Sequence, residues 1–127
     1  MSIDQGTTSS RVIIFNHEGD ILSFVNKEFR QYFPEPGFVQ HDAEEIWDSV
    51  QFCMKEALKK AGLTLGDIEA IGITNQRETT VMWDSVTSKP ICKAIVWQSS
   101  QSAEICDELI QDGHQDLFKN KTGLLIN

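Results

Sequence analysis

The first 29 residues alternate between apolar segments and polar turns, and this alternation restricts the chain to a fold that begins with an antiparallel sheet. Ile3 precedes the polar residues 4–10, and residues 11–15 (Arg-Val-Ile-Ile-Phe) are typical of a buried strand. A second turn at residues 16–20 precedes residues 21–29, whose later half alternates apolar and polar side chains. The pattern predicts three consecutive antiparallel strands. Only residues 1–3 precede the first turn, whereas a typical strand has about five or six residues, so we expect a short first strand.

A long amphipathic segment follows the three strands. Asp42 is a helix N-cap with Glu45 three positions later, the spacing of a capping box, and Gly62 ends the pattern. No further histidine or acidic cluster lies at ligand spacing from His41 and Asp42, so a cap is favoured over a metal site. The expected apolar face contains side chains spaced by three and four: Ile46, Trp47, Val50, Cys53, Met54, Ala57, Leu58 and Ala61.

The remaining residues predict further strands and helices. Residues 68–74 are a strand pattern after a helix, which indicates a parallel crossover onto the first sheet. Residues 79–83 and 91–97 predict short strands, and a helix is expected from Ser102 to Gly113. A shorter helix is expected at residues 116–121. The order of these elements indicates an α/β fold.

Charge and cysteine usage exclude several classes of partner. Nineteen acidic against 11 basic side chains give a net charge of −8, a field that repels nucleic acid and anionic membranes. No apolar stretch approaches the length of a membrane span. Cys53, Cys92 and Cys106 form no C-x-x-C pair and are odd in number, so they predict neither a disulfide framework nor a zinc site. A cytoplasmic protein fits these features best.

Residues 4–11 (Asp-Gln-Gly-Thr-Thr-Ser-Ser-Arg) combine groups that suit a polyphosphate. Gly6 lets the main chain turn so that successive N–H groups converge on an anion, the hydroxyl residues add donors, and Arg11 can neutralise oxygen charge. The carboxylate of Asp4 suits hydrated magnesium. No G-x-x-x-x-G-K-[ST] pattern occurs, so a phosphate cradle here is a hairpin. On composition alone, a structural turn rich in Thr and Ser explains these residues about equally well.

Three segments carry a resemblance to a known family. Residues 4–11 resemble the phosphate-binding motif of the carbohydrate kinases that share the ribonuclease H-like fold of actin and Hsp70, and most closely that of glycerol kinases. Residues 72–80 (Gly-Ile-Thr-Asn-Gln-Arg-Glu-Thr-Thr) resemble the polyol-binding segment of glycerol kinases, and residues 94–98 (Ala-Ile-Val-Trp-Gln) the segment that follows it. The similarities span nearly the whole chain.

The resemblance implies an enzyme that transfers the γ-phosphoryl group of MgATP to glycerol, giving ADP and glycerol 3-phosphate. It implies that Asp4 holds Mg²⁺ through water and contacts phosphate. The implied nucleotide phosphate contacts are Thr7, Thr8, Ser9 and Arg11, and the implied glycerol contacts are Arg77, Glu78 and Trp97.

The chemistry of the second segment agrees with this implication. A polyol hydroxyl both donates and accepts hydrogen bonds, and Arg77 and Glu78 offer donors and acceptors side by side. Trp97 can lie against the carbon chain of the substrate. The alternatives are a structural Arg–Glu ion pair at a sheet end and core packing of the tryptophan. Core packing is the role expected for Trp47 and Trp83, which receive no site assignment.

The resemblance also implies that the chain is a partial N-terminal kinase domain, residues 1–127, without the C-terminal domain. The proton-accepting general base and the adenosine pocket then lie beyond Asn127, and the piece alone is expected to be inactive. An Arg usual after the Trp-Gln pair is replaced by Ser99-Ser100-Gln101, which predicts weaker electrostatic stabilisation of phosphoryl transfer.

Three alternatives to a glycerol kinase remain open. They are a kinase for another small polyol or ketose, a catalytically inactive truncated remnant, and an actin-like structural ATPase, against which the pair Arg77 and Glu78 argues. An incomplete sheet exposes apolar edges, so homo-oligomerisation is expected.

Overall fold

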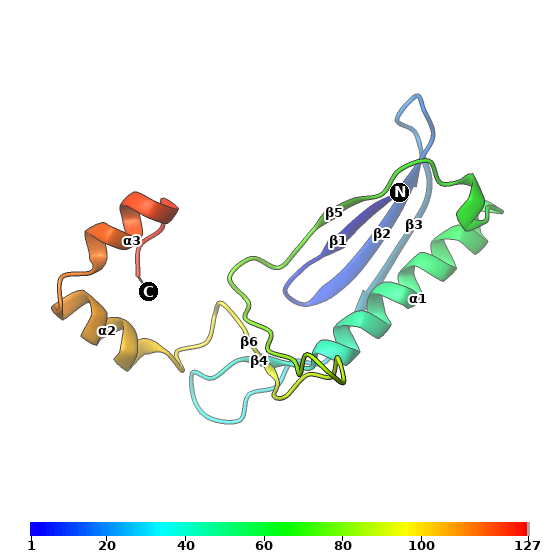
Figure 1. Cartoon of the computed structure of the whole chain (residues 1–127). Helices are drawn as coiled ribbons and strands as arrows, with labels where there is room; N and C mark the ends of the chain where they lie inside the picture. Colours follow the sequence, from blue (N-terminus) through cyan, green and yellow to red (C-terminus); the bar gives the residue numbers. More distant parts are fainter. Residues whose placement is uncertain (127) are drawn as a thin grey trace.

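The chain folds around a four-stranded sheet covered on one face by a long helix. The structure is a computed structural model that describes residues 1–126. Its strands run in the order β3-β2-β1-β5, and a separate two-stranded sheet pairs β4 with β6 (Figure 1). The elements in chain order are β1 (Ser2–Gln5), β2 (Ser9–Phe15), β3 (Ile21–Glu28), β4 (Gln40–His41), α1 (Ala43–Ala61), the 3-10 helix η1 (Leu65–Asp67), β5 (Gly72–Thr74), β6 (Ala94–Ile95), α2 (Ala103–Gln111) and α3 (Gln115–Thr122).

The predicted α/β order and the three antiparallel strands are confirmed. β2 pairs antiparallel with both β1 and β3, and β5 joins the other side of β1 in parallel. The first turn is shorter than predicted, because β1 continues through Gln5 and β2 begins at Ser9. Asp4 lies opposite Arg11 in this pairing, so both polar residues belong to strands and not to the turn.

The hydrophobic core lies between the sheet and α1. Its buried members come from β1 to β3 and from the inner face of the helix: Ile3, Val12, Ile14, Val25, Val50, Cys53, Ala57 and Leu58. Polar groups inside this layer are paired, since the buried hydroxyls of Ser10 and Ser49 lie 2.7 Å apart and Ser23 donates to the carbonyl of Ala57. Buried hydroxyls with partners avoid the penalty of unpaired polar groups.

Helix α1 begins and ends where the sequence predicts. The carboxylate of Asp42 accepts hydrogen bonds from the backbone N–H groups of Glu44 and Glu45, and Gly62 ends the helix at φ 67°. Trp47, however, is 59% exposed, so its predicted core packing is wrong. The sheet stops at β5 and covers only part of the helix's apolar face, which leaves the first turn beside an open groove.

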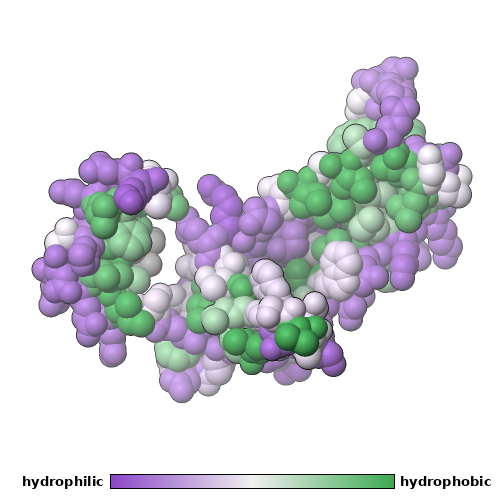
Figure 2. All heavy atoms as spheres, in the orientation of Figure 1, coloured by the Kyte–Doolittle hydropathy of each residue, from purple (hydrophilic) through white to green (hydrophobic). Residues whose placement is uncertain are grey.

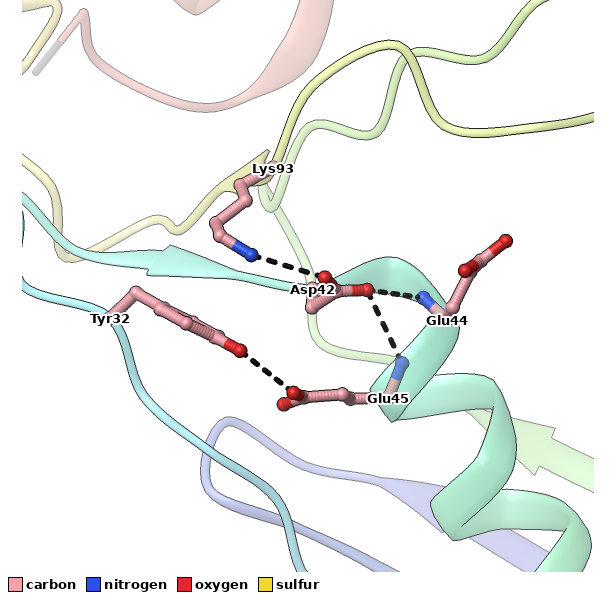
Figure 3. Close-up of polar contacts among 5 residues, drawn as sticks. All are labelled: Tyr32, Asp42, Glu44, Glu45 and Lys93. Carbon is pink, nitrogen blue, oxygen red and sulfur yellow. Dashed lines mark hydrogen bonds and ion pairs between the residues drawn. The ribbon is translucent and has the colours of Figure 1, made fainter.

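Polar contacts join the start of α1 to two distant loops (Figure 3). Lys93 donates to the Asp42 carboxylate across 3.1 Å, and its ammonium lies 3.8 Å from the ring centroid of Tyr32. The Tyr32 hydroxyl donates to Glu45 across 2.7 Å. The Lys93 hydrogen bond and those from the helix N–H groups hold the pKa of Asp42 below its ordinary value. We call Tyr32, Asp42, Glu45 and Lys93 the helix-start cluster.

The predicted strands at residues 79–83 and 91–97 are largely wrong. Only Ala94–Ile95 forms a strand, β6, while Thr80 and Trp83 make isolated bridges to Ile95 and Pro90. Trp83 is 63% exposed, so its predicted core packing is wrong too. These residues have high strand propensity but meet few partner strands.

The two predicted C-terminal helices are confirmed as α2 and α3. Neither contains a buried residue, and Figure 1 shows them standing apart from the four-stranded sheet. Within residues 1–126, no helix is both long and apolar enough to cross a membrane.

Candidate active site

The first hairpin turn brings the main chain close to itself at Gly6. The Gly6 N–H donates to the Ser9 carbonyl across 3.0 Å. A Cβ at Gly6 would lie 3.2 Å from that same carbonyl oxygen, a tighter contact than most side chains tolerate. Close approach of the Ser9 carbonyl, and not a left-handed backbone, therefore makes this position unfavourable for a side chain. Residues 6–8 form a compact loop between β1 and β2.

Asp4 and Arg11 face each other across this hairpin. The guanidinium Nη1 lies 3.7 Å from the Asp4 Oδ2, and both side chains are 44% exposed. The Arg11 guanidinium also lies 5.6 Å from the ring centroid of Phe24 on β3. Solvent screens such a half-exposed pair, so its worth is at most about 1 kcal/mol. Both charges remain accessible to a ligand.

The parallel pairing of β5 with β1 carries residues 75–78 to the side of this turn. Asp4 lies in register with Thr74, the last residue of β5, so the chain leaves the sheet beside the hairpin. Ligands in α/β proteins bind outside the carboxyl ends of strands. Glu78 adopts φ 62°, a left-handed conformation that is unfavourable for a residue with a Cβ.

One cavity of about 320 Å³ joins the two halves of the predicted site. Of the predicted site residues, Asp4, Thr7, Arg77, Glu78 and Trp97 line it, together with Gln5, Gly6, Asn75 and Gln76. Of the four predicted phosphate contacts, only Thr7 lines the cavity. Thr8, Ser9 and Arg11 do not line this cavity, although the Arg11 guanidinium lies 3.7 Å from the Asp4 carboxylate that does.

Trp97 closes one side of the cavity. Its indole Nε1 donates a hydrogen bond to the Thr7 hydroxyl across 3.1 Å. The ring is 53% exposed, which argues against the core-packing alternative. In the part of the chain that the structure describes, no ion pair joins Arg77 to Glu78, so their proximity in sequence is not explained by a mutual salt bridge.

The described residues contain no group of three or more His, Cys, Asp or Glu side chains that could hold a metal directly. Asp4 and Glu78 are the acidic side chains of the cavity. A single carboxylate beside hydroxyl groups suits Mg²⁺, which keeps several waters and binds proteins through one or two carboxylates.

Sequence reasoning missed Gln76. This side chain is 7% exposed, lines the cavity and contacts the buried His41, whose Nδ1 lies 3.3 Å from the Gln76 Nε2. Burial lowers the pKa of His41 below its ordinary value, which favours the neutral form of the ring. The position of Gln76 just beyond the carboxyl end of a parallel strand was the available signal.

Ser99 and Ser100 stand where the resembled family usually has an Arg, and here they hold a loop. The Ser99 hydroxyl accepts from the Val39 N–H across 3.1 Å, and the Ser100 hydroxyl donates to the Gly37 carbonyl across 3.0 Å. A Cβ at Gly37, which has φ 83°, would lie 2.5 Å from the Ser100 Oγ. These serines fix residues 34–39 against the segment that carries Trp97.

A model of the N-terminal domain of the FGGY family of carbohydrate kinases matches residues 1–127. Among curated proteins, the glycerol kinase of Oceanobacillus iheyensis is 60% identical over 127 residues, which are 100% of this chain and 25% of that protein. The glycerol kinase of Bacillus licheniformis is 58% identical over the same 127 residues, 26% of its length. The chain thus spans about a quarter of the length of these relatives.

Solved structures agree with this likeness. Plasmodium falciparum glycerol kinase, solved with ADP, matches with a TM-score of 0.89 and 37% identity, over 99% of this chain and 25% of the other. A gluconate kinase from Lactobacillus acidophilus matches with a TM-score of 0.85 at 22% identity, over 96% of this chain and 24% of the other. At that identity the second likeness concerns the fold alone. The actin- and Hsp70-like fold predicted from the sequence is confirmed by these neighbours.

Proposed function

The chain belongs to the FGGY family of carbohydrate kinases, and we propose that it is the N-terminal part of an ATP-dependent glycerol kinase. The proposed reaction moves the γ-phosphoryl group of ATP onto a hydroxyl of glycerol and yields ADP and glycerol 3-phosphate. The observation that carries the proposal is the cavity in which Arg77, Glu78 and Trp97 meet the hairpin turn. Residues 1–127 are proposed to be part of one N-terminal kinase domain.

The polyol end of the cavity has the chemistry of a small-alcohol site. Arg77 supplies guanidinium donors, Glu78 supplies carboxylate acceptors, and Trp97 supplies an apolar face for a carbon chain. The volume of about 320 Å³ lies at the small end of ligand pockets, which span roughly 300–1,000 Å³. A three-carbon polyol fits within this volume.

The phosphate end is the hairpin itself. We assign nucleotide phosphate contacts to Thr7, Thr8, Ser9 and Arg11, because hydroxyl donors and a half-exposed guanidinium surround the tight turn at Gly6. Thr7 lines the cavity, and Arg11 lies beside it, within 3.7 Å of the Asp4 carboxylate that also lines it. A polyphosphate lying along the hairpin would therefore run from Thr7 toward Arg11.

The residues present fit a hydrated magnesium ion. Asp4 is half-exposed at the carboxyl end of β1, and the turn beyond it is tight at Gly6, where a Cβ would lie 3.2 Å from the Ser9 carbonyl oxygen. We propose that Asp4 holds Mg²⁺ through water. The ion supplies positive charge for the phosphate oxygens during transfer.

The chain's own residues orient the acceptor. We propose that Arg77 and Glu78 fix two hydroxyls while Trp97 excludes water from the carbon chain, leaving the third hydroxyl toward the hairpin. Its oxygen then forms a bond to the γ-phosphorus as the bond to the β-phosphate oxygen breaks, and ADP leaves. The proton goes to a general base that we assign to residues outside 1–127, so the piece alone is expected to be inactive.

We also propose a cytoplasmic protein that self-associates. Cys53 is buried and Cys92 is exposed as free thiols, as suits a reducing compartment. Self-association is supported by an apolar groove of about 640 Å³ between β5 and α1, lined among others by Ile46, Trp47 and Ile73. Figure 2 shows apolar side chains gathered at the surface over the sheet.

The experiment is a comparison of acceptors with the complete gene product. We expect ATP-dependent phosphorylation of glycerol with a higher kcat/KM than any pentulose, hexonate or four-carbon polyol in the panel. Arg77→Gln is expected to abolish glycerol turnover. The matched control is Arg30→Gln, because the Arg30 guanidinium stacks on the Tyr32 ring outside the cavity. Faster turnover of a pentulose would replace glycerol kinase by a ketose kinase of the same family.

A further inference from the structure

A chain of hydrogen bonds runs through the protein from a backbone carbonyl to the edge of the candidate site. The Gln31 Nε2 donates to the Phe29 carbonyl across 3.2 Å, and the Gln31 Oε1 contacts the His41 Nε2. The His41 Nδ1 contacts the Gln76 Nε2 across 3.3 Å. His41 is fully buried and Gln76 nearly so. Buried polar side chains that touch each other in series restrict one another's orientation.

The direction of each bond in the series follows from the first one. The Phe29 carbonyl can only accept, so the Gln31 amide must present its NH₂ there and its oxygen to His41. The His41 Nε2 must then carry the proton, which leaves Nδ1 of the neutral ring as an acceptor. An acceptor at Nδ1 requires the NH₂ of Gln76. With a neutral ring, these contacts assign one orientation to each group between residues 29 and 76, and they leave the buried Gln76 Oε1 without a hydrogen-bond partner among the described residues.

His41 itself is held from several sides. It belongs to β4, which pairs with β6, and the edge of its ring meets the Phe29 ring with centroids 5.1 Å apart. The next residue, Asp42, is fixed by the helix N–H groups and by Lys93 within the helix-start cluster (Figure 3). These contacts fix the position of the His41 ring, and the fixed ring can in turn orient the Gln76 side chain.

The segment that needs orienting follows immediately. Arg77 and Glu78 are exposed, and Glu78 has φ 62°, a conformation that costs about 1–2 kcal/mol for a residue with a Cβ. Residues in such conformations persist only where neighbours hold them. Of residues 75–78, only Gln76 is buried. It is the anchor of the segment.

We propose that His41 is a positioning residue for the substrate-binding pair Arg77 and Glu78, acting through its hydrogen bond to Gln76. The identity of the substrate in this inference rests on the proposed function. The hydrogen bond between His41 and Gln76 does not depend on it. His41 touches neither substrate nor reacting atoms. It fixes where the polyol-binding segment lies relative to the hairpin turn.

Two amide variants of His41 separate positioning from mere stability. Asn at position 41 places an amide oxygen near the position of Nδ1 and can still accept from Gln76. Gln at position 41 places its amide near the position of Nε2 and keeps only the contact to Gln31. Both variants remove the buried ring, so both lower the unfolding midpoint. Only His41→Gln leaves the Gln76 NH₂ without an acceptor.

The kinetic test uses the complete gene product. His41→Gln is expected to raise the glycerol KM by about tenfold, the effect of one buried polar group left unpaired. The KM for ATP and kcat should stay within about twofold, and His41→Asn should retain a glycerol KM within about threefold of wild type. Equal KM effects of the two variants, or no effect of either, would overturn the proposal.

A second variant covers the case in which the His41 variants fail to fold. Gln76→Met keeps the length of the side chain but has no N–H donor, and it is expected to raise the glycerol KM by a factor like that of His41→Gln. An unchanged glycerol KM in Gln76→Met would overturn the proposal.

A spectroscopic measurement separates this inference from the proposed function. In the uniformly ¹⁵N-labelled gene product, the proposal requires a neutral His41 ring protonated at Nε2 at pH 7. The Glu78 backbone N–H resonance should shift in His41→Gln and stay near its wild-type position in His41→Asn. An Nδ1-protonated ring or a charged ring would overturn the anchor. Absence of glycerol turnover in wild type, with these signals as expected, would overturn only the proposed function.

Discussion

The indole Nε1 of Trp97 donates a hydrogen bond to the hydroxyl of Thr7 across 3.1 Å, although 90 positions separate the two residues. Thr7 belongs to the hairpin proposed to hold phosphate, and Trp97 is the proposed apolar wall of the polyol site. The bond therefore joins the two halves of the cavity directly. A ligand that filled both halves would lie beside it.

This contact predicts a measurable coupling between the two residues. Thr7→Val removes the acceptor and keeps the branched shape, while Trp97→Phe removes the donor and keeps an aromatic ring. In the complete gene product each change is expected to raise the glycerol KM about threefold, as for one exposed hydrogen bond. The double variant should be no worse than the single variants. Multiplying effects in this double-mutant cycle would show that the two residues act independently.

The cap of α1 gives a prediction on stability. Asp42→Ala removes the acceptor for two helix N–H groups and the Lys93 contact, and it is expected to lower the free energy of unfolding by about 1–2 kcal/mol. Asp48→Ala, on the exposed side of the same helix, should stay within about 0.5 kcal/mol of wild type. Urea denaturation of both variants measures this difference.

The same cap should respond to pH in one direction. The Lys93 hydrogen bond and the helix N–H groups lower the pKa of folded Asp42, so the unfolded chain takes up the proton first as pH falls. The stability contributed by Asp42 is present above the unfolded value of 3.8 and is lost as pH falls through the lower folded pKa. The gap between wild type and Asp42→Ala should therefore narrow below that value. A gap that widened in acid would contradict the assigned pKa direction.

The apolar groove predicts self-association of the 127-residue chain. Ile73 on the edge strand β5 is 73% exposed, and an exposed apolar edge invites pairing with another copy. Ile73→Lys should reduce association in sedimentation velocity, and Val86→Lys should not, because Val86 is 90% exposed in a loop outside the groove. A wild-type chain that sediments as a monomer at every concentration would refute this prediction.

Local signals in the sequence were sufficient for the parts of the fold whose determinants are local. Helix α1 was predictable because Asp42, Gly62 and the three-and-four spacing all lie within one segment. The strands predicted at residues 79–83 and 91–97 failed because strand propensity does not supply a partner, and only Ala94–Ile95 finds one. Trp47 was misplaced because periodicity shows which side of a helix is apolar, not how far the sheet covers it.

The residues of the candidate site could be predicted from the sequence, but their arrangement in space could not. The predicted site residues lie in short segments whose composition suits phosphate or polyol binding: Asp4, Arg11, Arg77, Glu78 and Trp97. Their assembly into one cavity depends on the parallel pairing of β5 with β1, which brings position 74 beside position 4. The anchor from His41 to Gln76 joins residues 35 positions apart through a side-chain contact, and no local pattern encodes such a contact.

The central claim is that the cavity beside the hairpin binds glycerol through Arg77 and Glu78. The most direct measurement is the kcat/KM for glycerol of Glu78→Gln in the complete gene product, with Glu69→Gln, an exposed carboxylate outside the cavity, as control. Replacing a carboxylate acceptor of a substrate hydroxyl is expected to lower kcat/KM by about tenfold to a hundredfold. The KM for ATP should stay unchanged. An unaltered kcat/KM for glycerol in Glu78→Gln, or an equal loss in Glu69→Gln, would contradict the account.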